Sequence, residues 1–143
     1  MKQKKSVGKY ISYIHRHFHI YMQQQFHSYG IGSGQFHFLM YLYKKQGITQ
    51  ETLAEELQLD KGTCARAIQK LEDLGYVTRT RDQEDKRCYN IYLTKKAEHL
   101  KPTALKILKE WTNHLLNGFS DPEKDQLFSF LERLANNATL PQS

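Results

Sequence analysis

The feature that most constrains this fold is a change in the period of the apolar residues near the middle of the chain. Between residues 49 and 75, apolar side chains recur at steps of three and four, which predicts two short amphipathic helices that meet at Leu59 and Asp60. Further along, β-branched and aromatic residues predict two strands, at residues 76–78 and 89–93. Two helices with a tight junction, followed by a hairpin, are typical of a winged helix-turn-helix.

Short polar side chains mark the expected helix starts. Each can accept a hydrogen bond from a backbone N–H of the first turn, and the expected N-caps are Ser33, Thr49, Asp60, Thr94 and Ser120. Ser120 and Glu123 also have the spacing of a capping box. Pro102 falls within the predicted helix that follows Thr94 and is expected to kink it.

Amphipathic helices flank the central segment on both sides. Apolar residues at helical spacing predict a long helix over about residues 9–29 and two more between residues 95 and 136. We therefore expect one mainly α-helical domain over residues 1–143, with a small β-hairpin wing. Residues 31–94 would form the winged helix-turn-helix lobe, and residues 7–30 and 95–136 would form dimerisation helices. A lone protomer would leave the aromatic and leucine stripes of these helices in water, which favours a homodimer.

The charge balance points to a polyanionic partner. The chain has 21 Lys and Arg against 15 Asp and Glu, a formal net charge of +6, which favours nucleic acid or an anionic surface. No apolar run approaches the roughly 18 residues of a membrane helix, so no membrane association is expected. Cys64 and Cys88 are the two cysteines, too few for a disulfide framework, and a cytoplasmic location is expected.

The second helix of the turn is expected to present a polar, cationic face opposite its buried stripe. The residues predicted on or near this face are Lys61, Gly62, Thr63, Arg66, Gln69 and Lys70. In a DNA major groove, Thr63 could meet a phosphate or a base edge, Arg66 a guanine and Gln69 an adenine. An ordinary solvated face is the alternative that this helix alone leaves open.

The hairpin tip combines cations with acids. The predicted contacts to a narrow minor groove come from basic residues with an acidic neighbour, namely Arg81, Asp85, Lys86 and Arg87. The role expected for Asp85 is to pair with Arg87 or Arg81 and hold that arginine in place. A solvated, salt-bridged turn is the alternative for this segment.

The stretch from Asp60 to Thr94 resembles the core signature of the MarR (multiple antibiotic resistance regulator) family. Three motifs at matching spacing carry the resemblance: Leu71, Glu72 and Gly75 at the end of the recognition helix, Asp85, Lys86 and Arg87 at the wing tip, and the closing Leu93 and Thr94. The order of helices is similar over about residues 7–136. One departure is Ala97, in a region where the family commonly has glycine.

The resemblance implies a sequence-specific transcriptional regulator that binds double-stranded DNA. It implies a homodimer on a pseudo-palindromic operator, acting as a repressor that a small anionic, aromatic effector releases. His15, Arg16 and His19 on the first helix are the candidate effector-binding residues, with Arg16 as the carboxylate partner. The alternative for Arg16 is an exposed or interface-paired arginine.

The histidines and cysteines suggest further alternatives within the same fold. His15 and His19 are one helical turn apart with His17 between them, a spacing that can hold a metal. No carboxylate or cysteine lies near them in the sequence, so neither a metal nor another cofactor is expected. Redox sensing through Cys88 is a second alternative, although no activating base is evident.

Two other classes of function are disfavoured by the sequence. No paired carboxylates in a cleft context, no nucleophile elbow and no phosphate-binding glycine loop are evident, so the chain is not expected to be an enzyme. The glycine-rich segment at residues 30–34 follows a predicted helix instead of a strand. A winged-helix module that binds protein would need an apolar or acidic recognition helix, whereas this one is basic and polar.

Overall fold

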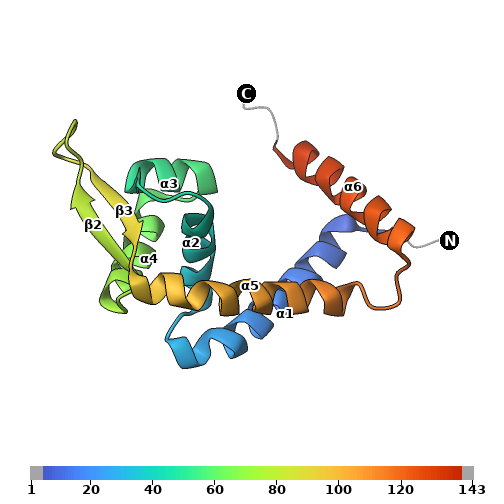
Figure 1. Cartoon of the computed structure of the whole chain (residues 1–143). Helices are drawn as coiled ribbons and strands as arrows, with labels where there is room; N and C mark the ends of the chain where they lie inside the picture. The colour runs from blue at the N-terminus through green and yellow to red at the C-terminus, as the bar shows by residue number, and fades with distance from the viewer. Residues whose placement is uncertain (1–4, 140–143) are drawn as a thin grey trace. The chain divides into compact units, whose positions relative to one another are not determined.

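The fold is mainly helical with a small antiparallel sheet, as the sequence predicts (Figure 1). The structure is a computed structural model that describes residues 5–139. Over this range the elements are, in chain order, α1 (Val7–Phe26), the 3-10 turn η1 (His27–Tyr29), α2 (Ser33–Lys44), β1 (Ile48–Thr49), α3 (Gln50–Leu57), α4 (Lys61–Asp73), β2 (Val77–Arg81), β3 (Tyr89–Leu93), α5 (Lys95–Leu115) and α6 (Asp121–Ala138).

The chain divides into two compact units within α5. The first unit runs to Leu108 and contains α1 to α4, the sheet and most of α5, and the second begins at Lys109 and contains the end of α5 and α6. Pro102 lies inside α5, as expected, and the helix continues to Leu115; the kink at Pro102 stays a prediction. The assignment of residues 31–94 to a DNA-binding lobe and of the flanking helices to dimerisation stays a prediction.

The core of the first unit is built from one face of each helix. In α4, Cys64, Ile68 and Leu71 are fully buried, on the stripe that the sequence predicts. α2 contributes Leu39 and Leu42, which are also fully buried. Other members of the same cluster include Met22, Phe26, Leu53, Val77 and Ile91. Because the apolar stripe of α4 points into this core, the opposite face of the helix is left to solvent.

A three-stranded sheet with the order β1-β3-β2 completes the first unit. β2 and β3 form the predicted hairpin, in register from Val77 opposite Leu93 to Arg81 opposite Tyr89. β2 is therefore longer than the strand expected at residues 76–78. The sequence does not predict β1, because two residues are too few to show an alternating pattern. β1 is a strand because it pairs with the second edge of β3.

Hydrogen bonds at the helix starts confirm most of the predicted N-caps. A side-chain oxygen accepts from the backbone N–H three residues further on at Thr49, Asp60, Thr94 and Ser120. The prediction for Ser33 is wrong, since Ser33 is the first residue of α2 and Gly32 is the N-cap. Gln35 accepts a hydrogen bond from the N–H of Gly32 at 2.9 Å and so fixes the cap one residue earlier. The first helix ends at Phe26, and a 3-10 turn carries the chain on to Tyr29.

Two helices, one in each unit, expose many apolar side chains. The exposed large apolar residues are Val7, Tyr10, Ile11, Tyr13, Ile14 and Ile20 on α1, and Phe128, Phe130, Leu131 and Leu134 on α6. The described part of α6 has no buried residue. Within residues 5–139, no helix combines the length and apolar content needed to cross a membrane.

Candidate nucleic-acid interface

The start of α4 is fixed by Asp60. Its carboxylate accepts from the backbone N–H of Thr63 at 2.8 Å and from the Thr63 hydroxyl at 2.7 Å. These hydrogen bonds, led by the one from the side chain, hold the pKa of the Asp60 carboxyl below its usual value. The carboxylate therefore stays charged at the positive end of the helix, where a negative charge is stabilising.

The exposed face of α4 carries most of the side chains predicted to contact DNA. Lys61, Gly62, Arg66 and Lys70 are exposed, and Thr63 is half-buried. The guanidinium of Arg66 lies back along the first turn, with Nη2 at 3.4 Å from the Thr63 hydroxyl. A Cβ at Gly62 would lie 3.2 Å from Nη1 of Arg66, so the missing side chain leaves room for this conformation. The structure thus brings Thr63, Gly62 and Arg66 together at the exposed start of α4.

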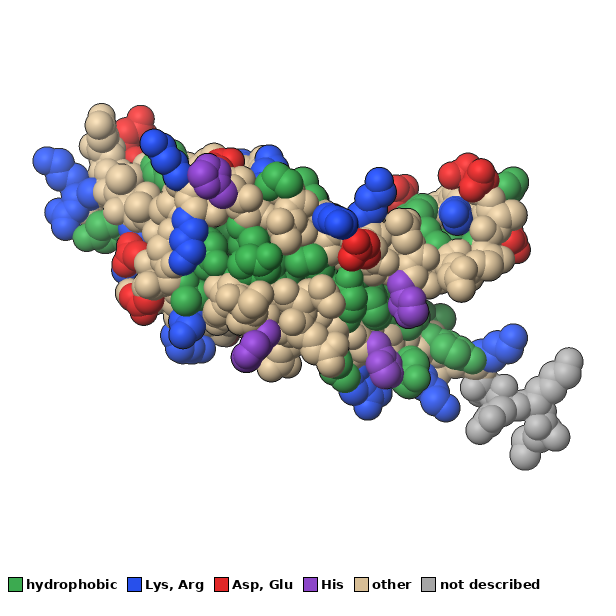
Figure 2. Space-filling model, turned by 60° about the horizontal axis from the view of Figure 1, so that its bottom comes forward, with side chains coloured by type: hydrophobic (Ala, Val, Ile, Leu, Met, Phe, Trp, Pro, Cys, Tyr) green, Lys and Arg blue, Asp and Glu red, His purple; other side chains and the backbone are tan. Residues whose placement is uncertain are grey.

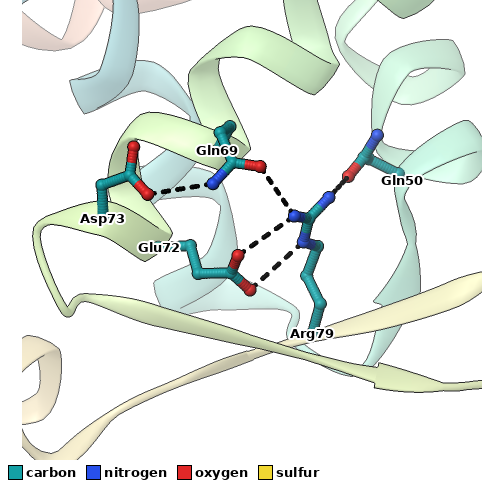
Figure 3. A network of polar contacts seen from close by, with 5 residues as sticks. All are labelled: Gln50, Gln69, Glu72, Asp73 and Arg79. Atoms are coloured by element: carbon teal, nitrogen blue, oxygen red, sulfur yellow. Dashed lines mark hydrogen bonds and ion pairs between the residues drawn. The ribbon is translucent and has the colours of Figure 1, made fainter.

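Gln69 lies on the same helix but takes part in a polar network (Figure 3). Its amide oxygen accepts from Arg79 Nη2 at 2.8 Å, and its amide nitrogen donates to Asp73 at 2.9 Å. Arg79 also donates from Nη2 and Nε to the two oxygens of Glu72, at 3.0 and 3.2 Å, and from Nη1 to the side-chain oxygen of Gln50 at 3.4 Å. The contact with Glu72 raises the pKa of Arg79.

The network around Arg79 was not predicted from the sequence. Arg79 lies opposite Ile91 in the hairpin, so both side chains are on the inner face of the sheet. Val77, two residues earlier, is buried on that face. The spacing of Val77 and Arg79 in the strand indicates that both side chains lie on the same face. It does not indicate which residues of α3 and α4 contact Arg79.

The wing tip is fixed by an ion pair between Asp85 and Arg87. The carboxylate of Asp85 accepts from Arg87 Nε at 3.0 Å and Nη2 at 3.2 Å, while the Arg87 side chain is 90% exposed. The pairing lowers the pKa of Asp85 and raises the pKa of Arg87. Of the two partners predicted for Asp85, the structure selects Arg87. Lys86, between them, is exposed.

Arg81 is held by an aromatic side chain instead of an acid. It ends β2, and its Nη2 donates to the Tyr89 hydroxyl at 3.1 Å with the guanidinium 5.6 Å from the ring centroid. Asp82 accepts from the Asp85 backbone N–H and from Asn90, so this acid shapes the turn. Figure 2 shows both blue basic and red acidic side chains at the wing end of the molecule.

The predicted effector residues lie on α1, near His37 of α2, which was not predicted to belong to this site. The rings of His15 and His19 are 4.3 Å apart, and the ring of His37 on α2 is 5.9 Å from that of His19. Arg16 is exposed on the same helix. Nε2 of His19 is buried without a hydrogen-bond partner. His37 was missed because only the packing of α2 on α1 brings it to this site.

Desolvation and the charges of neighbouring histidines disfavour the charged forms of His19 and His37. Burial, and then the charge of His15, lower the pKa of His19. Partial desolvation of the ring, followed by the charges of His19 and His15, lowers the pKa of His37, although the residue remains exposed. Within residues 5–139, no three His, Cys, Asp or Glu side chains are grouped so as to hold a metal ion.

The pKa values of both cysteines are raised, which favours the neutral thiol over the thiolate. Cys64 is fully buried in the core, and burial raises the pKa of its thiol to about 11. The pKa of Cys88 is also raised, first by desolvation and then by Asp85. A raised pKa lowers the thiolate fraction on which redox reactivity depends.

Two helices joined by a tight turn, a hairpin wing and exposed cations on both define a winged helix-turn-helix DNA-binding protein. A model of the MarR family matches residues 31–89. The chain is 32% identical to the HTH-type transcriptional regulator BilQ of Clostridium symbiosum, over 87% of each chain. The chain belongs to the MarR family of transcriptional regulators.

Solved structures agree with this assignment. A MarR transcriptional regulator from Methanosarcina mazei superposes with a TM-score of 0.89 at 48% identity, covering 92% of this chain and 94% of that one. A MarR family regulator from Listeria monocytogenes, solved in complex with a 26mer DNA, has a TM-score of 0.86 at 27% identity and covers 94% and 89%.

Proposed function

We propose that the chain is a homodimeric repressor that binds a pseudo-palindromic site in double-stranded DNA and is released by a small anionic, aromatic effector. The observation that carries the proposal is Arg87 at the wing tip, which is exposed although its guanidinium is paired with Asp85. The outer face of α4 is also polar and cationic. We expect the protein to act in the cytoplasm and to catalyse no reaction.

In the proposed complex, α4 enters the major groove. The N-terminal half of the helix faces the bases, where Arg66 forks onto a guanine and Thr63 meets a base edge or a phosphate. Gly62 lets the backbone approach closely, and Lys61 and Lys70 neutralise phosphates. The Listeria relative solved with DNA supports DNA binding by this fold, since its structure covers 94% of the chain.

The wing supplies the second set of contacts. Arg87, held by Asp85, is proposed to enter the adjacent minor groove, where arginine suits the narrow and electronegative floor. Arg81 and Lys86 contact the backbone on either side. The Asp85 carboxylate orients its neighbour instead of opposing the DNA, because its charge is already paired.

Dimerisation would be carried by the helices outside residues 31–94. The exposed apolar residues of α1 and of α6 supply the surface to be covered, and Figure 2 shows hydrophobic side chains open to solvent on the face it presents. Two recognition helices in such a dimer would read half-sites about one DNA turn apart, roughly 34 Å.

The effector is proposed to bind beside α1. His15, Arg16 and His19 offer a cation and ring donors to a carboxylate and an aromatic ring. The buried, unpartnered Nε2 of His19 supports a polar ligand at this place, because a buried nitrogen without a partner is unfavourable.

Selection of bound fragments from random DNA tests this proposal. A palindrome with half-sites about 10 base pairs apart is the expected product, and its affinity should fall steeply with salt. Repeating the selection with aromatic carboxylates should identify a compound that abolishes enrichment. Failure to enrich any sequence at low salt would refute DNA recognition.

A further inference from the structure

The amide of Gln69 is engaged at both ends before any DNA arrives. A glutamine that reads adenine needs its oxygen and its nitrogen together, one for N6 and the other for N7 of the base. In this structure the oxygen faces the Arg79 guanidinium and the nitrogen faces the Asp73 carboxylate. The two opposite charges also fix which way the amide points, since a flipped amide would meet like polarity at both ends.

Arg79 in turn has little capacity left for another partner. Four hydrogen bonds to Gln50, Gln69 and Glu72 use its Nε and both terminal nitrogens. Its side chain is 26% exposed, compared with 90% for Arg87. The guanidinium therefore links β2 to α3 and α4 through hydrogen bonds (Figure 3). Its charge is balanced by Glu72.

We propose that Arg79 is a positioning residue that locks the wing onto α4 and withholds Gln69 from base contact. Base preference then comes from the first half of α4, around Arg66, while the second half is held by the network. This inference rests on the proposed insertion of α4 into the major groove. It replaces the adenine contact expected for Gln69 from the sequence with a role inside the protein.

The first test compares single alanine variants in the same random-DNA selection. Gln69→Ala is expected to keep the wild-type base preference at every position and to bind the selected site within about threefold of wild type. Arg66→Ala is the positive control and should relax the preference at one base pair by about tenfold or more. Gln25→Ala, an exposed glutamine on α1, is the matched control. A tenfold loss of discrimination in Gln69→Ala would overturn the inference.

The second test separates geometry from charge at position 79. Arg79→Lys keeps the charge but cannot reproduce a guanidinium that bonds to acceptors on two helices. We expect about tenfold weaker operator binding with an unchanged salt slope, because no phosphate contact is lost. Wild-type affinity in Arg79→Lys, or a salt slope reduced by about one unit in Arg79→Met, would show that Arg79 acts as a charge on DNA.

The third test uses rescue of base preference. In Arg79→Lys the amide of Gln69 is released, so the selected sequence should change at one base pair, and the double variant Gln69→Ala/Arg79→Lys should regain the wild-type preference there. An unchanged preference in Arg79→Lys would contradict the inference. If wild-type protein enriches no sequence, the proposed function fails; if Gln69→Ala loses specificity while wild type selects a palindrome, only this inference fails.

Discussion

The carboxylate of Asp85 receives both a side-chain and a backbone hydrogen bond from Arg87, two residues further along the wing. The guanidinium donates at 3.0 and 3.2 Å and the Arg87 N–H at 3.1 Å. An acid at the tip of a cationic wing therefore restricts the arginine that the wing presents. Net charge alone predicts that Asp85 weakens DNA binding. We expect the opposite, that Asp85 increases the affinity for DNA.

Replacing Asp85 with alanine is expected to weaken operator binding although it removes a negative charge. Without the carboxylate, the Arg87 side chain would be free to change rotamer in the unbound protein. It would lose this freedom on binding DNA, which corresponds to about three- to tenfold in affinity. Fluorescence anisotropy at fixed salt measures the effect. Glu84→Ala removes the same charge from an exposed neighbour and should bind equally or more tightly. Tighter binding by Asp85→Ala would show that the carboxylate merely repels DNA.

Gly62→Ala should separate stability from recognition. Alanine favours a helix over glycine by up to about 1 kcal/mol, which offsets the crowding of the capping oxygen Oδ1 of Asp60, 3.2 Å from the new Cβ, so the melting temperature should change little. The new Cβ would lie 3.2 Å from Nη1 of Arg66 and displace it, and discrimination at the base pair read by Arg66 should fall about tenfold. Gly34→Ala, also the second residue of its helix and with an open Cβ position, should leave DNA binding unchanged. Equal base preference in both variants would contradict the role given to Gly62.

Thr94→Ala should destabilise the first unit by about 2 kcal/mol. The Thr94 hydroxyl donates to the Gly75 carbonyl at 2.6 Å and accepts from the Ala97 N–H at 3.3 Å, so one side chain ties the end of α4 to the start of α5. Urea unfolding followed by circular dichroism measures the loss. Thr78→Ala, at an exposed position on β2, should change stability by less than about 0.5 kcal/mol. A similar small change in Thr94→Ala would refute this account.

Stability should fall as the pH falls below about 6.5. His19 and His37 have lowered pKa values in the folded chain, so the unfolded chain binds more protons between the folded and unfolded pKa values, and stability rises with pH in that window. The groups that face His37 are His19 and His15 of α1. His37→Gln should flatten the dependence of the melting temperature on pH between pH 7.5 and 5.5, whereas His99→Gln, on α5 and outside the contact between His37 and α1, should retain the wild-type slope. Parallel curves for wild type and His37→Gln would exclude this cause.

The parts of the fold that sequence reasoning predicted depend on short-range chemistry. The caps at Asp60 and Ser120 follow from one oxygen and one N–H three residues apart, and the buried stripe of α4 follows from helical spacing. Ser33 was misplaced because Gln35 competes for the same turn from within the helix. The pairing of Asp85 with Arg87 was within reach because only two residues separate them.

Long-range contacts were not accessible in the same way. β1 exists because β3 offers it an edge more than 40 residues later, and His37 joins His19 only through the packing of α2 on α1. Arg79 directly follows the predicted strand at residues 76–78, but its three partners come from α3 and α4. The hydrogen bond between Arg79 and Gln69 depends on the packing of β2 against α4. The pattern of residue types along α4 alone does not show this packing.

Thr49 belongs to two elements at once. It pairs with Asn90 as part of β1, and its hydroxyl caps α3 by accepting from Thr52 at 3.1 Å. Thr49 therefore connects α3 to the edge of the sheet, and we expect the wing and the helix-turn-helix to move together. In a homodimer, an effector would then change the distance between the two winged helix-turn-helix lobes and leave the structure of each lobe unchanged.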